Sequence, residues 1–523
     1  MKTLGTLPSL RVSRNPLVGF VAFAIVIFAG YKAAEAILAD DLATLSYAAI
    51  FLVGGAVTIA ILNDWRRGLY FLVAWILFED FVRKYLGNNM AIYFAKDILA
   101  IILYASFFRA QRKNRAEELR IPFRIPLLLF VWFGIIQMFN PASTSIFYGI
   151  LGVKLQFLYI PLIYVGYAFI ESEEEVHRFF SFLCVLIIMV AGLGLAQSII
   201  GPTFLNPSRL QEDIRELSTT YRVAPISGLI AYRPNSVFVS AGRFIDFLLV
   251  SWIVSLGYAA YLLLRRRRGR LLAFTTVGVV AAASLMSASR GAFMWNAGTG
   301  LLMTAGFLWG APWREREALR VLRAIVRTAL MVGAGIIVLV LVFPNEFGSR
   351  VAIYSETLMP DSPTSELVHR TQTYPLLQLQ YAFDHPRWPY GYGIGTCSLG
   401  AQYVSRIMGA KPMGIGVETG LGNLIVELGI LGPVLWCVLG FAIAIAAWKV
   451  LRDLKSTPWF PLGLAIALYA IVLFFPMMFT GASAYQDFLL NSDLWLLLGI
   501  FFRLRLFPKA VEAAVYDAAL GQG

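Results

Sequence analysis

Long apolar stretches, separated by short polar segments, run along almost the whole chain. An α-helix needs about 20 apolar residues to cross a bilayer, so each stretch predicts a transmembrane helix. The pattern predicts about fourteen such helices, at residues 17–38, 43–62, 68–81, 91–108, 125–139, 155–170, 179–200, 244–264, 271–287, 292–310, 325–343, 423–448, 459–479 and 488–502. The expected fold is therefore an all-α polytopic membrane protein, with residues 1–523 forming a single membrane domain.

The composition agrees with this class, and the charge pattern sets an orientation. Hydrophobic residues make up 59% of the chain and charged residues 14%, whereas soluble domains contain about 45–50% apolar and 25% charged residues. Basic clusters at 109–124, 265–270 and 314–327 fall on one side of the expected membrane, and the positive-inside rule places that side, with both termini, in the cytoplasm. The net charge of +13 is then explained by topology and anionic lipid, and no nucleic-acid partner is expected.

One arginine stands at the centre of a long apolar stretch. Between Leu271 and Gly310, Arg290 is the only charged residue. The stretch is long enough for a helical hairpin that crosses the membrane twice, and the small residues from Ser287 to Gly291 allow a tight turn at its outer tip. Because a charge within a span is costly, Arg290 is interpreted as functional. The alternative is an arginine that extends to the lipid headgroups.

Two outer loops are long enough to carry a binding site. The first spans residues 201–242, and the second, which is expected to be partly helical, spans residues 344–422. Both are rich in arginine, which runs against the positive-inside trend. Since guanidinium is suited to phosphate, we expect these loops to meet a phosphorylated lipid on the periplasmic side. Their arginines are Arg209, Arg215, Arg222 and Arg233 in the first loop, and Arg350, Arg370, Arg387 and Arg406 in the second.

The remaining candidate motifs point away from nucleotides and metals. Gly391, Gly393 and Gly395 imitate a nucleotide-binding glycine loop, but no lysine follows them and no βαβ unit is expected, so a turn is predicted. The three histidines and three cysteines of the chain are too scattered in the sequence to predict a metal cluster or a disulfide framework. No metal site is expected.

Three segments carry a family resemblance. They are SASRG at 287–291, HRTQTYPLLQLQYAFDHPRWPYGYGIGT at 369–396 and ETGLGNLIVELGILGP at 418–433. A fourth, YRPNSVFVSAGRFIDF at 232–247, is weaker and makes Arg233 the matching arginine. In this order and on the outer face, the segments resemble the core of the O-antigen ligase and O-antigen polymerase superfamily, over residues 233–433.

The resemblance implies metal-independent glycosyl transfer without a cofactor, from an undecaprenyl-diphosphate-linked glycan. Loss of the lipid diphosphate develops negative charge, which Arg233, Arg290 and Arg370 would stabilise. His385 and Tyr374 would contribute to binding the glycan. The site would face the periplasm of a bacterial inner (cytoplasmic) membrane.

The chain departs from the family pattern at one catalytic position. Ligases of this family carry a histidine nine residues before the glutamate of the ELG motif, which is Glu427 here. Glu418 occupies that position. Because a carboxylate can also accept a proton from a hydroxyl, Glu418 is expected to be the general base. Its alternative role is an ion pair with Arg370 or Arg406 that closes the second loop.

The departure favours a polymerase, which would join lipid-linked repeats into an exopolysaccharide or O-antigen. One alternative is a ligase that transfers a finished glycan to another acceptor, and a further one is a lipid-linked oligosaccharide flippase. A flippase would show two halves with similar hydropathy, whereas the distinctive charges of this chain gather in two loops. A polymerase of this kind would work beside a flippase and a chain-length regulator of the same pathway.

Overall fold

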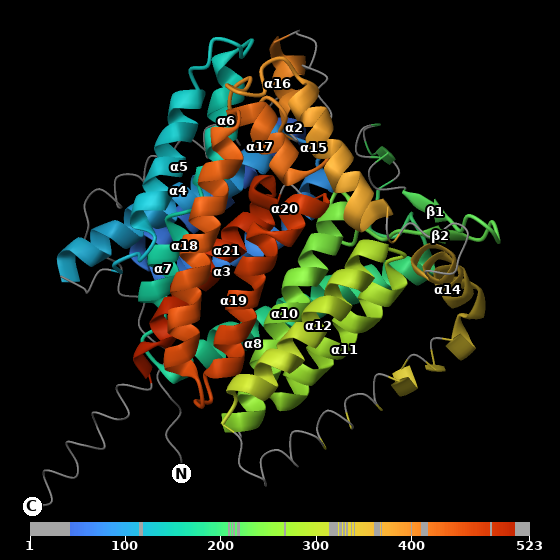
Figure 1. The fold of residues 1–523 in the computed structure, drawn as a ribbon. Coiled ribbons are helices and arrows are strands. Elements are labelled where there is room, and N and C mark those ends of the chain that lie inside the picture. Colours follow the sequence, from blue (N-terminus) through green and yellow to red (C-terminus); the bar gives the residue numbers. More distant parts are fainter. Residues whose placement is uncertain are drawn as a thin grey trace, which may run out of the picture. The chain divides into compact units, whose positions relative to one another are not determined.

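The computed structural model describes residues 42–114, 119–207, 220–265, 268–312, 340–359, 369–398, 400–408, 417–481 and 484–507, with single residues and short runs within 210–216 and 323–338 and at 367. Their regular secondary structure is almost entirely helical (Figure 1). They belong to two compact units, of which one comprises Met1–Ile76 with Met90–Glu117 and the other Leu77–Asn89 with Glu118–Gly523. The two units are treated separately below.

The first unit is a small helical assembly. It contains α2 (Leu42–Asn63), the first part of α3 (Trp65–Tyr85) and α4 (Met90–Asn114). The hydroxyl of Ser106 on α4 donates to the carbonyl of Ile61 on α2 at 2.9 Å. Asp64 accepts the backbone N–H of Arg66 at 3.0 Å and thereby caps α3. The polar side chain of Ser106, between two apolar helices, is thus hydrogen-bonded to the backbone.

The second unit contains the remaining helices and one short sheet. Its apolar helices are α5 (Arg124–Gln137), α6 (Ile146–Phe157), α7 (Leu162–Phe169), α8 (Glu173–Ile200), α10 (Ala241–Arg265), α11 (Arg270–Met286), α12 (Arg290–Gly310), α18 (Leu431–Leu454), α19 (Phe460–Phe474) and α21 (Phe488–Leu504). The other elements are β1 (Tyr221–Val223), β2 (Ile230–Tyr232), α14 (Pro344–Leu358), η1 (His369–Thr373), α15 (Tyr374–Asp384), α16 (Ala401–Met408), α17 (Gly420–Leu428), α20 (Pro476–Thr480) and η2 (Ala484–Gln486).

The prediction of an all-α, multi-pass membrane protein is confirmed. Among the described residues, six helical segments are long and apolar enough to cross a membrane, or up to seven if a pair bent by 115° counts as one. They are Met90–Lys113, Ile146–Phe169, Glu173–Ile200, Ala241–Arg265, Leu431–Leu454 and Phe460–Thr480. The expected span at 17–38 lies outside the described residues. The total of about fourteen stays a prediction.

Two expected spans are interrupted where the sequence carries a proline or a glycine. The span expected at 155–170 belongs to the segment Ile146–Phe169, whose α-helix is interrupted by turns between α6 and α7, where Pro161 has no N–H to continue the first helix. The span expected at 423–448 breaks between α17 and α18 at Gly429, whose φ is 70°. A Cβ at Gly429 would lie 2.4 Å from the carbonyl oxygen of Pro389, so only glycine fits there.

Glycines also allow α7 and α21 to cross at backbone distance. A Cβ at Gly166 would lie 2.2 Å from the carbonyl oxygen of Leu496, and a Cβ at Gly499 would lie 2.1 Å from that of Ile163. Small residues permit such close approach in lipid, where helices associate by packing and not by the hydrophobic effect. These glycines therefore fix which helices are neighbours.

The end of α8 that begins at Glu173 is bound to the C-terminal end of α10. Ser172 and Glu175 form a capping box, and the carboxylates in the first turn suit the positive end of the helix dipole. Glu173 accepts hydrogen bonds from Tyr261 at 2.7 Å and from Nε of Arg265 at 2.9 Å. The basic residue that follows a predicted span thus has an acidic partner on the neighbouring helix.

Both expected outer loops contain regular structure. The first contains the antiparallel pair β1–β2, in which Arg222 lies opposite Ala231. One face of this hairpin, with Ala224 and Ala231, packs on Ala288 and Ile353. The second contains α14, η1, α15 and α16. In Figure 1, β1, β2 and α14 lie beside the ends of α11 and α12 that meet at residues 287–289.

A fully buried arginine joins these parts. The side chain of Arg350, on α14, donates to the backbone carbonyls of Met286 at 3.2 Å, Ser198 at 3.0 Å and Tyr232 at 3.3 Å. It also forms an ion pair with Glu346 at 2.6 Å. Carbonyls at the ends of helices lack partners within the helix. Here one guanidinium group donates hydrogen bonds to such carbonyls of α8 and α11, and to one of β2. Arg350 is therefore structural.

Replacing Arg350 by Met should destabilise the protein strongly. Each buried carbonyl left without a donor costs about 1–3 kcal/mol, so the total loss amounts to several kcal/mol. Thermal unfolding of the purified protein in detergent should show a markedly lower Tm. Arg387→Met, at an exposed arginine of the same expected loop, is the control, and an equal Tm for the two variants would contradict the structural role of Arg350.

Candidate functional site

Arg290 is the first residue of α12. Ser289 caps this helix, its hydroxyl accepting the N–H of Ala292 at 3.4 Å, and Ala288 before it adopts a φ of 52°. Ser287 accepts the N–H of Ser289 at 3.2 Å, which closes the turn. The predicted tight turn is therefore confirmed, and its serines satisfy the free N–H groups of the helix start. Arg290, which follows this turn, is half-buried.

Arg233 lies close enough to Arg290 for their charges to interact, although the two residues are distant in the sequence. Its burial, and next the positive charge of Arg290, lower the pKa of Arg233. Within the described part of the chain, the buried Nε–H of Arg233 has no hydrogen-bond partner. Like charges repel, so a pair of guanidinium groups brought together suits an anion with more than one negative oxygen.

A half-buried tyrosine interacts with the arginines. The hydroxyl of Tyr354, on α14, donates to the carbonyl of Leu285 at 2.9 Å. Burial raises the pKa of Tyr354 to about 12, and the positive charges of Arg350 and Arg222 oppose this increase. Tyr354 in turn interacts electrostatically with Arg233. We call Arg222, Arg233 and Arg290 the arginine cluster.

Polar side chains fix the segment that follows Arg233. The side-chain oxygen of Gln197 accepts the N–H of Asn235 at 2.9 Å and of Ser236 at 2.7 Å. Lys84 donates to the carbonyl of Ser236 at 2.8 Å, and Ser236 has a φ of 50°. The backbone next to Arg233 is thus held in a conformation that few residues adopt, by partners that are buried.

The other arginine of the same sequence segment has a structural role. Arg243, in the first turn of α10, forms ion pairs with Asp80 and, at 3.1 Å, with Asp487. Both carboxylates are buried, so the charge of Arg243 is compensated inside the helix bundle. Of the two arginines in this segment, Arg233 is the one that lies with Arg290.

Glu418 and Tyr374 are in contact. The hydroxyl of Tyr374, at the start of α15, donates to the carboxylate of Glu418. The backbone N–H of Glu418 donates to the side chain of Gln378 at 2.9 Å. Thr419 then caps α17 by accepting the N–H of Gly422 at 3.2 Å. Glu418 itself is exposed, so its carboxylate is held in place and open to solvent.

His385 packs between aromatic rings at the far end of α15. Its ring centroid lies 5.0 Å from that of Tyr381 and 6.2 Å from that of Tyr392. In the described part of the chain its Nε2 is buried without a hydrogen-bond partner. Tyr374 contacts His369 instead, at 6.0 Å between ring centroids. The structure therefore does not pair His385 with Tyr374.

Arg370 belongs to η1, the turn that precedes α15. Its side chain lies outside the described residues, as does that of Arg406. The expected ion pairs between Glu418 and these arginines stay predictions. Arg209 also lies outside the described residues.

The predicted turn at the three glycines is confirmed, and its partner is the end of α17. Gly391, Gly393 and Gly395 all have positive φ. The N–H of Gly393 donates to the carbonyl of Glu427 at 2.9 Å, and a Cβ at Gly391 would lie 2.5 Å from that same oxygen. Here the glycines permit backbone-to-backbone packing.

Glu427 holds this turn from inside, a role that sequence reasoning missed. Its carboxylate is fully buried and accepts the N–H of Cys397 at 3.1 Å. The side-chain amides of Gln156 and Gln486 donate to it at 3.1 and 3.2 Å. Charged groups are almost never buried without partners. A glutamate inside an apolar run was the available signal, but only the structure shows which donors face it.

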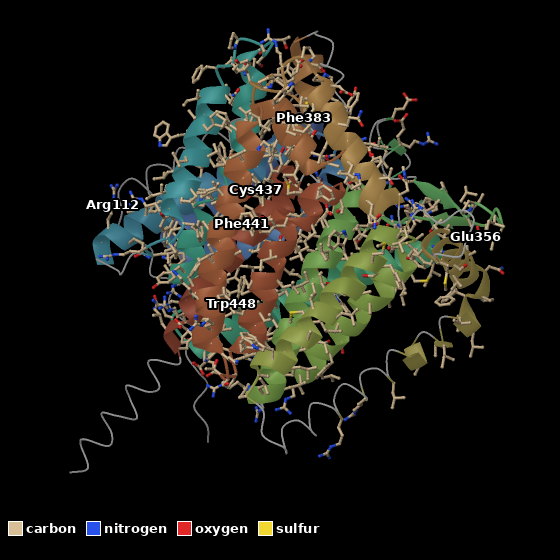
Figure 2. All side chains as sticks on the ribbon, viewed as in Figure 1. Arg112, Glu356, Phe383, Cys437, Phe441 and Trp448 are labelled. Atoms are coloured by element: carbon tan, nitrogen blue, oxygen red, sulfur yellow. The ribbon has the colours of Figure 1, made fainter. Side chains whose placement is uncertain are left out.

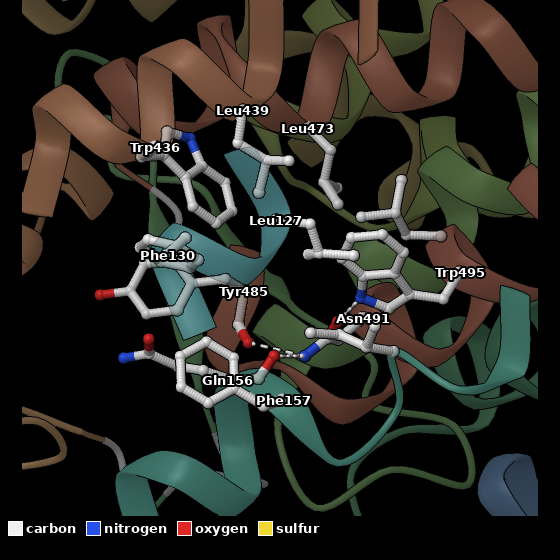
Figure 3. Close-up of a pocket in the computed structure, with 12 residues that line it drawn as sticks. Leu127, Phe130, Gln156, Phe157, Trp436, Leu439, Leu473, Tyr485, Asn491 and Trp495 are labelled. Atoms are coloured by element: carbon white, nitrogen blue, oxygen red, sulfur yellow. Dashed lines mark hydrogen bonds between the residues drawn. The ribbon is translucent and has the colours of Figure 1, made fainter. Parts of the chain in front are cut away.

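The enclosed pocket in Figure 3 is too small to bind a substrate. Its lining is mostly apolar, with Trp436 and Trp495 on opposite sides (Figure 3). Its free volume is about 10 Å³, which is roughly the space of one water molecule. Asn491 satisfies the polar groups at its base, donating to the carbonyl of Leu155 at 2.8 Å and accepting from Trp495 at 2.7 Å. It is a packing gap in the bundle.

The described contacts thus form two groups. The arginine cluster lies where β2, α14 and the start of α12 meet, and the contact between Glu418 and Tyr374 lies where α15 meets α17. Compared with known proteins, the sequence matches no family model, and no curated protein matches it.

Glu427→Gln should lower the Tm of the protein, although the side chain keeps its shape. In the wild type, three N–H donors face the two oxygens of the carboxylate. In the variant, an NH₂ group replaces one of these oxygens and cannot accept their hydrogen bonds. Each unmade buried hydrogen bond costs about 1–3 kcal/mol. The exchanged variant Glu427→Gln with Gln486→Glu restores one acceptor among the donors and should recover part of the loss. Thermal unfolding measures both, and an unchanged Tm in the single variant would show that the carboxylate is dispensable.

Proposed function

We propose that the protein is a membrane glycosyltransferase that polymerises undecaprenyl-diphosphate-linked oligosaccharide repeats on the periplasmic face. The observation that carries the proposal is the electrostatic interaction between Arg233 and Arg290, which come from separate segments, together with that of Arg222 and Arg233 with Tyr354. A diphosphate carries several negative oxygens, and forked guanidinium groups match them. That the substrate is a glycan is inferred from the resemblance to the O-antigen ligase and polymerase superfamily.

In this proposal the reaction is a single displacement. The oxygen of an acceptor sugar hydroxyl forms a bond to the anomeric carbon of the donor. The bond from that carbon to the diphosphate breaks, and its electron pair leaves with the lipid diphosphate. Arg233 and Arg290, with Arg370, stabilise this charge, while Glu418 takes the hydroxyl proton.

The hydrogen bond from Tyr374 supports the role given to Glu418. A general base must be exposed to its substrate and fixed in direction. Glu418 is exposed and is fixed by Tyr374 and Gln378. His385, whose Nε2 is buried without a partner in the described structure, is assigned to the glycan side of the site.

The proposal includes a cellular setting. About fourteen spans place both termini in the cytoplasm and residues 201–242 and 344–422 in the periplasm. The enzyme would sit in a bacterial inner membrane, receive its substrate from a flippase and work with a chain-length regulator. It needs neither metal nor cofactor in this scheme, because fixed cations stabilise the leaving group.

Arg290→Lys should be almost as inactive as Arg290→Ala, since lysine lacks the fork that binds two oxygens. Removing one such donor typically lowers the rate by about 10²–10³. The assay is purified protein with a synthetic lipid-linked repeat, and the product is a ladder of polymer. Arg387→Lys, at an exposed arginine outside the proposed site, should keep the ladder.

If folded Arg290→Ala protein gave the wild-type ladder, the proposed site would be rejected. The alternative, in which Arg290 only extends to the lipid headgroups, would then be favoured. Transfer of glycan to an added core-lipid acceptor, with no ladder, would identify a ligase instead.

Glu418→Gln should lower turnover by about 10²–10⁴, which is typical for loss of a general base. Donor binding and thermal stability should persist, because Tyr374 and Gln378 can still bond to the amide and the backbone. Glu418→His should recover part of the rate. Turnover of Glu418→Gln at the wild-type rate would exclude the base role, and joint loss of binding and stability would show that Glu418 only holds the loop.

A further inference from the structure

A groove lies at the end of the helix bundle where α18 and α21 finish. Its volume is about 240 Å³, whereas about 10–15 Å³ is enough for one water molecule. It is open on one side to the surroundings of the bundle. Its principal lining residues are Ala442, Ile445, Ala446 and Lys449 from α18, Phe502 from α21, and Arg505 just after α21.

The spacing along α18 produces the groove. Residues 442, 445, 446 and 449 are three or four positions apart and so share one face of the helix. The alanines are short, which leaves a hollow between α18 and the ring of Phe502. On the neighbouring face, Phe441 and Trp448 are large and strongly exposed, at 60% and 52% (Figure 2).

Aromatic residues mark the depth of this groove in the membrane. Trp448 directly precedes Lys449 and stacks on Trp309 with 5.2 Å between ring centroids. The ammonium of Lys455 lies 4.3 Å from the centroid of Trp309. Tryptophan with adjacent lysine is typical of the membrane–water boundary. The alanine end of the groove therefore lies toward the apolar layer, and the lysine end lies at the headgroups.

The charged end of the groove is positive and partly fixed. Arg505 forms an ion pair at 2.6 Å with Asp453 through Nε. This contact engages one edge of the guanidinium and holds the group beside the groove. Lys449 is exposed on the last turns of α18, and Pro122, which also lines the groove, lies between Arg120 and Arg124 in the sequence.

We propose that this groove binds one acidic phospholipid of the surrounding bilayer. The lipid phosphate lies between Lys449 and Arg505, and one acyl chain lies along Ala442 and Ala446. Two features support this occupant over bulk lipid. The hollow has an apolar end and a cationic end, which match the acyl chain and the phosphate of one phospholipid. Basic pockets between transmembrane helices also select acidic headgroups. The proposal does not depend on the reaction assigned to the other face.

The test compares charge-matched variants. Lys449→Gln with Arg505→Gln removes two positive charges at the groove. The control, Arg268→Gln with Lys455→Gln, also removes two exposed positive charges. These residues lie at the same end of the bundle, because Tyr261, near the end of α10, stacks on Trp459, which follows α18. Ala442→Leu fills the hollow and leaves the charge unchanged.

Each delipidated protein is mixed in neutral detergent with phosphatidylglycerol or phosphatidylcholine, and is measured by native mass spectrometry and thermal unfolding. The wild type should retain one phosphatidylglycerol and show a higher Tm with it than with phosphatidylcholine. The groove charge variant and Ala442→Leu should lose this difference, with the Tm in detergent alone unchanged, whereas the control variant should keep it.

Equal losses in the two charge variants would overturn the proposal in favour of general attraction to a basic surface. An equal response of the wild type to both lipids would also overturn it, since the groove would then be selecting only apolar chains.

Discussion

Backbone carbonyls at the ends of helices and strands need donors, and Arg350 supplies three of them at once. It bonds to the last turn of α8, to the end of α11 and to β2. Water cannot reach these oxygens because the side chain is fully buried, so an unmade bond there carries the full desolvation cost. The positions of the hairpin β1–β2 and of the turn before Arg290 both depend on this residue.

The arginine cluster is positioned by that arrangement and by a second set of contacts. Gln197 and Lys84 hold the residues after Arg233, while Ser289 starts α12 at Arg290. The two guanidinium groups are therefore brought together by rigid elements, in spite of their repulsion. In the proposed function, the diphosphate would offset this repulsion, and fixed cations would stabilise its developing charge.

Arginine and lysine serve different purposes at the two ends of the bundle. On the side of Arg290, Arg350 is buried and fixed by hydrogen bonds, and the arginine cluster is half-buried. On the side of Lys449, they are exposed and close to tryptophan. The first pattern suits tight recognition of phosphate groups, and the second suits contact with lipid headgroups.

The sequence by itself determined the class of the protein, the tight turn before Arg290 and the glycine turn at 391–395, because apolar length and turn chemistry are local properties. It singled out Arg233 through the family resemblance, but it did not reveal the structural roles of Arg350 and Arg243. Only the tertiary structure did so, since the role of each depends on partners such as Ser198 or Asp80, which are distant in the chain. The same holds for Glu427, whose amide donors come from residues 156 and 486. Hydropathy records how apolar a segment is, whereas burial of charge is decided by contacts across the fold.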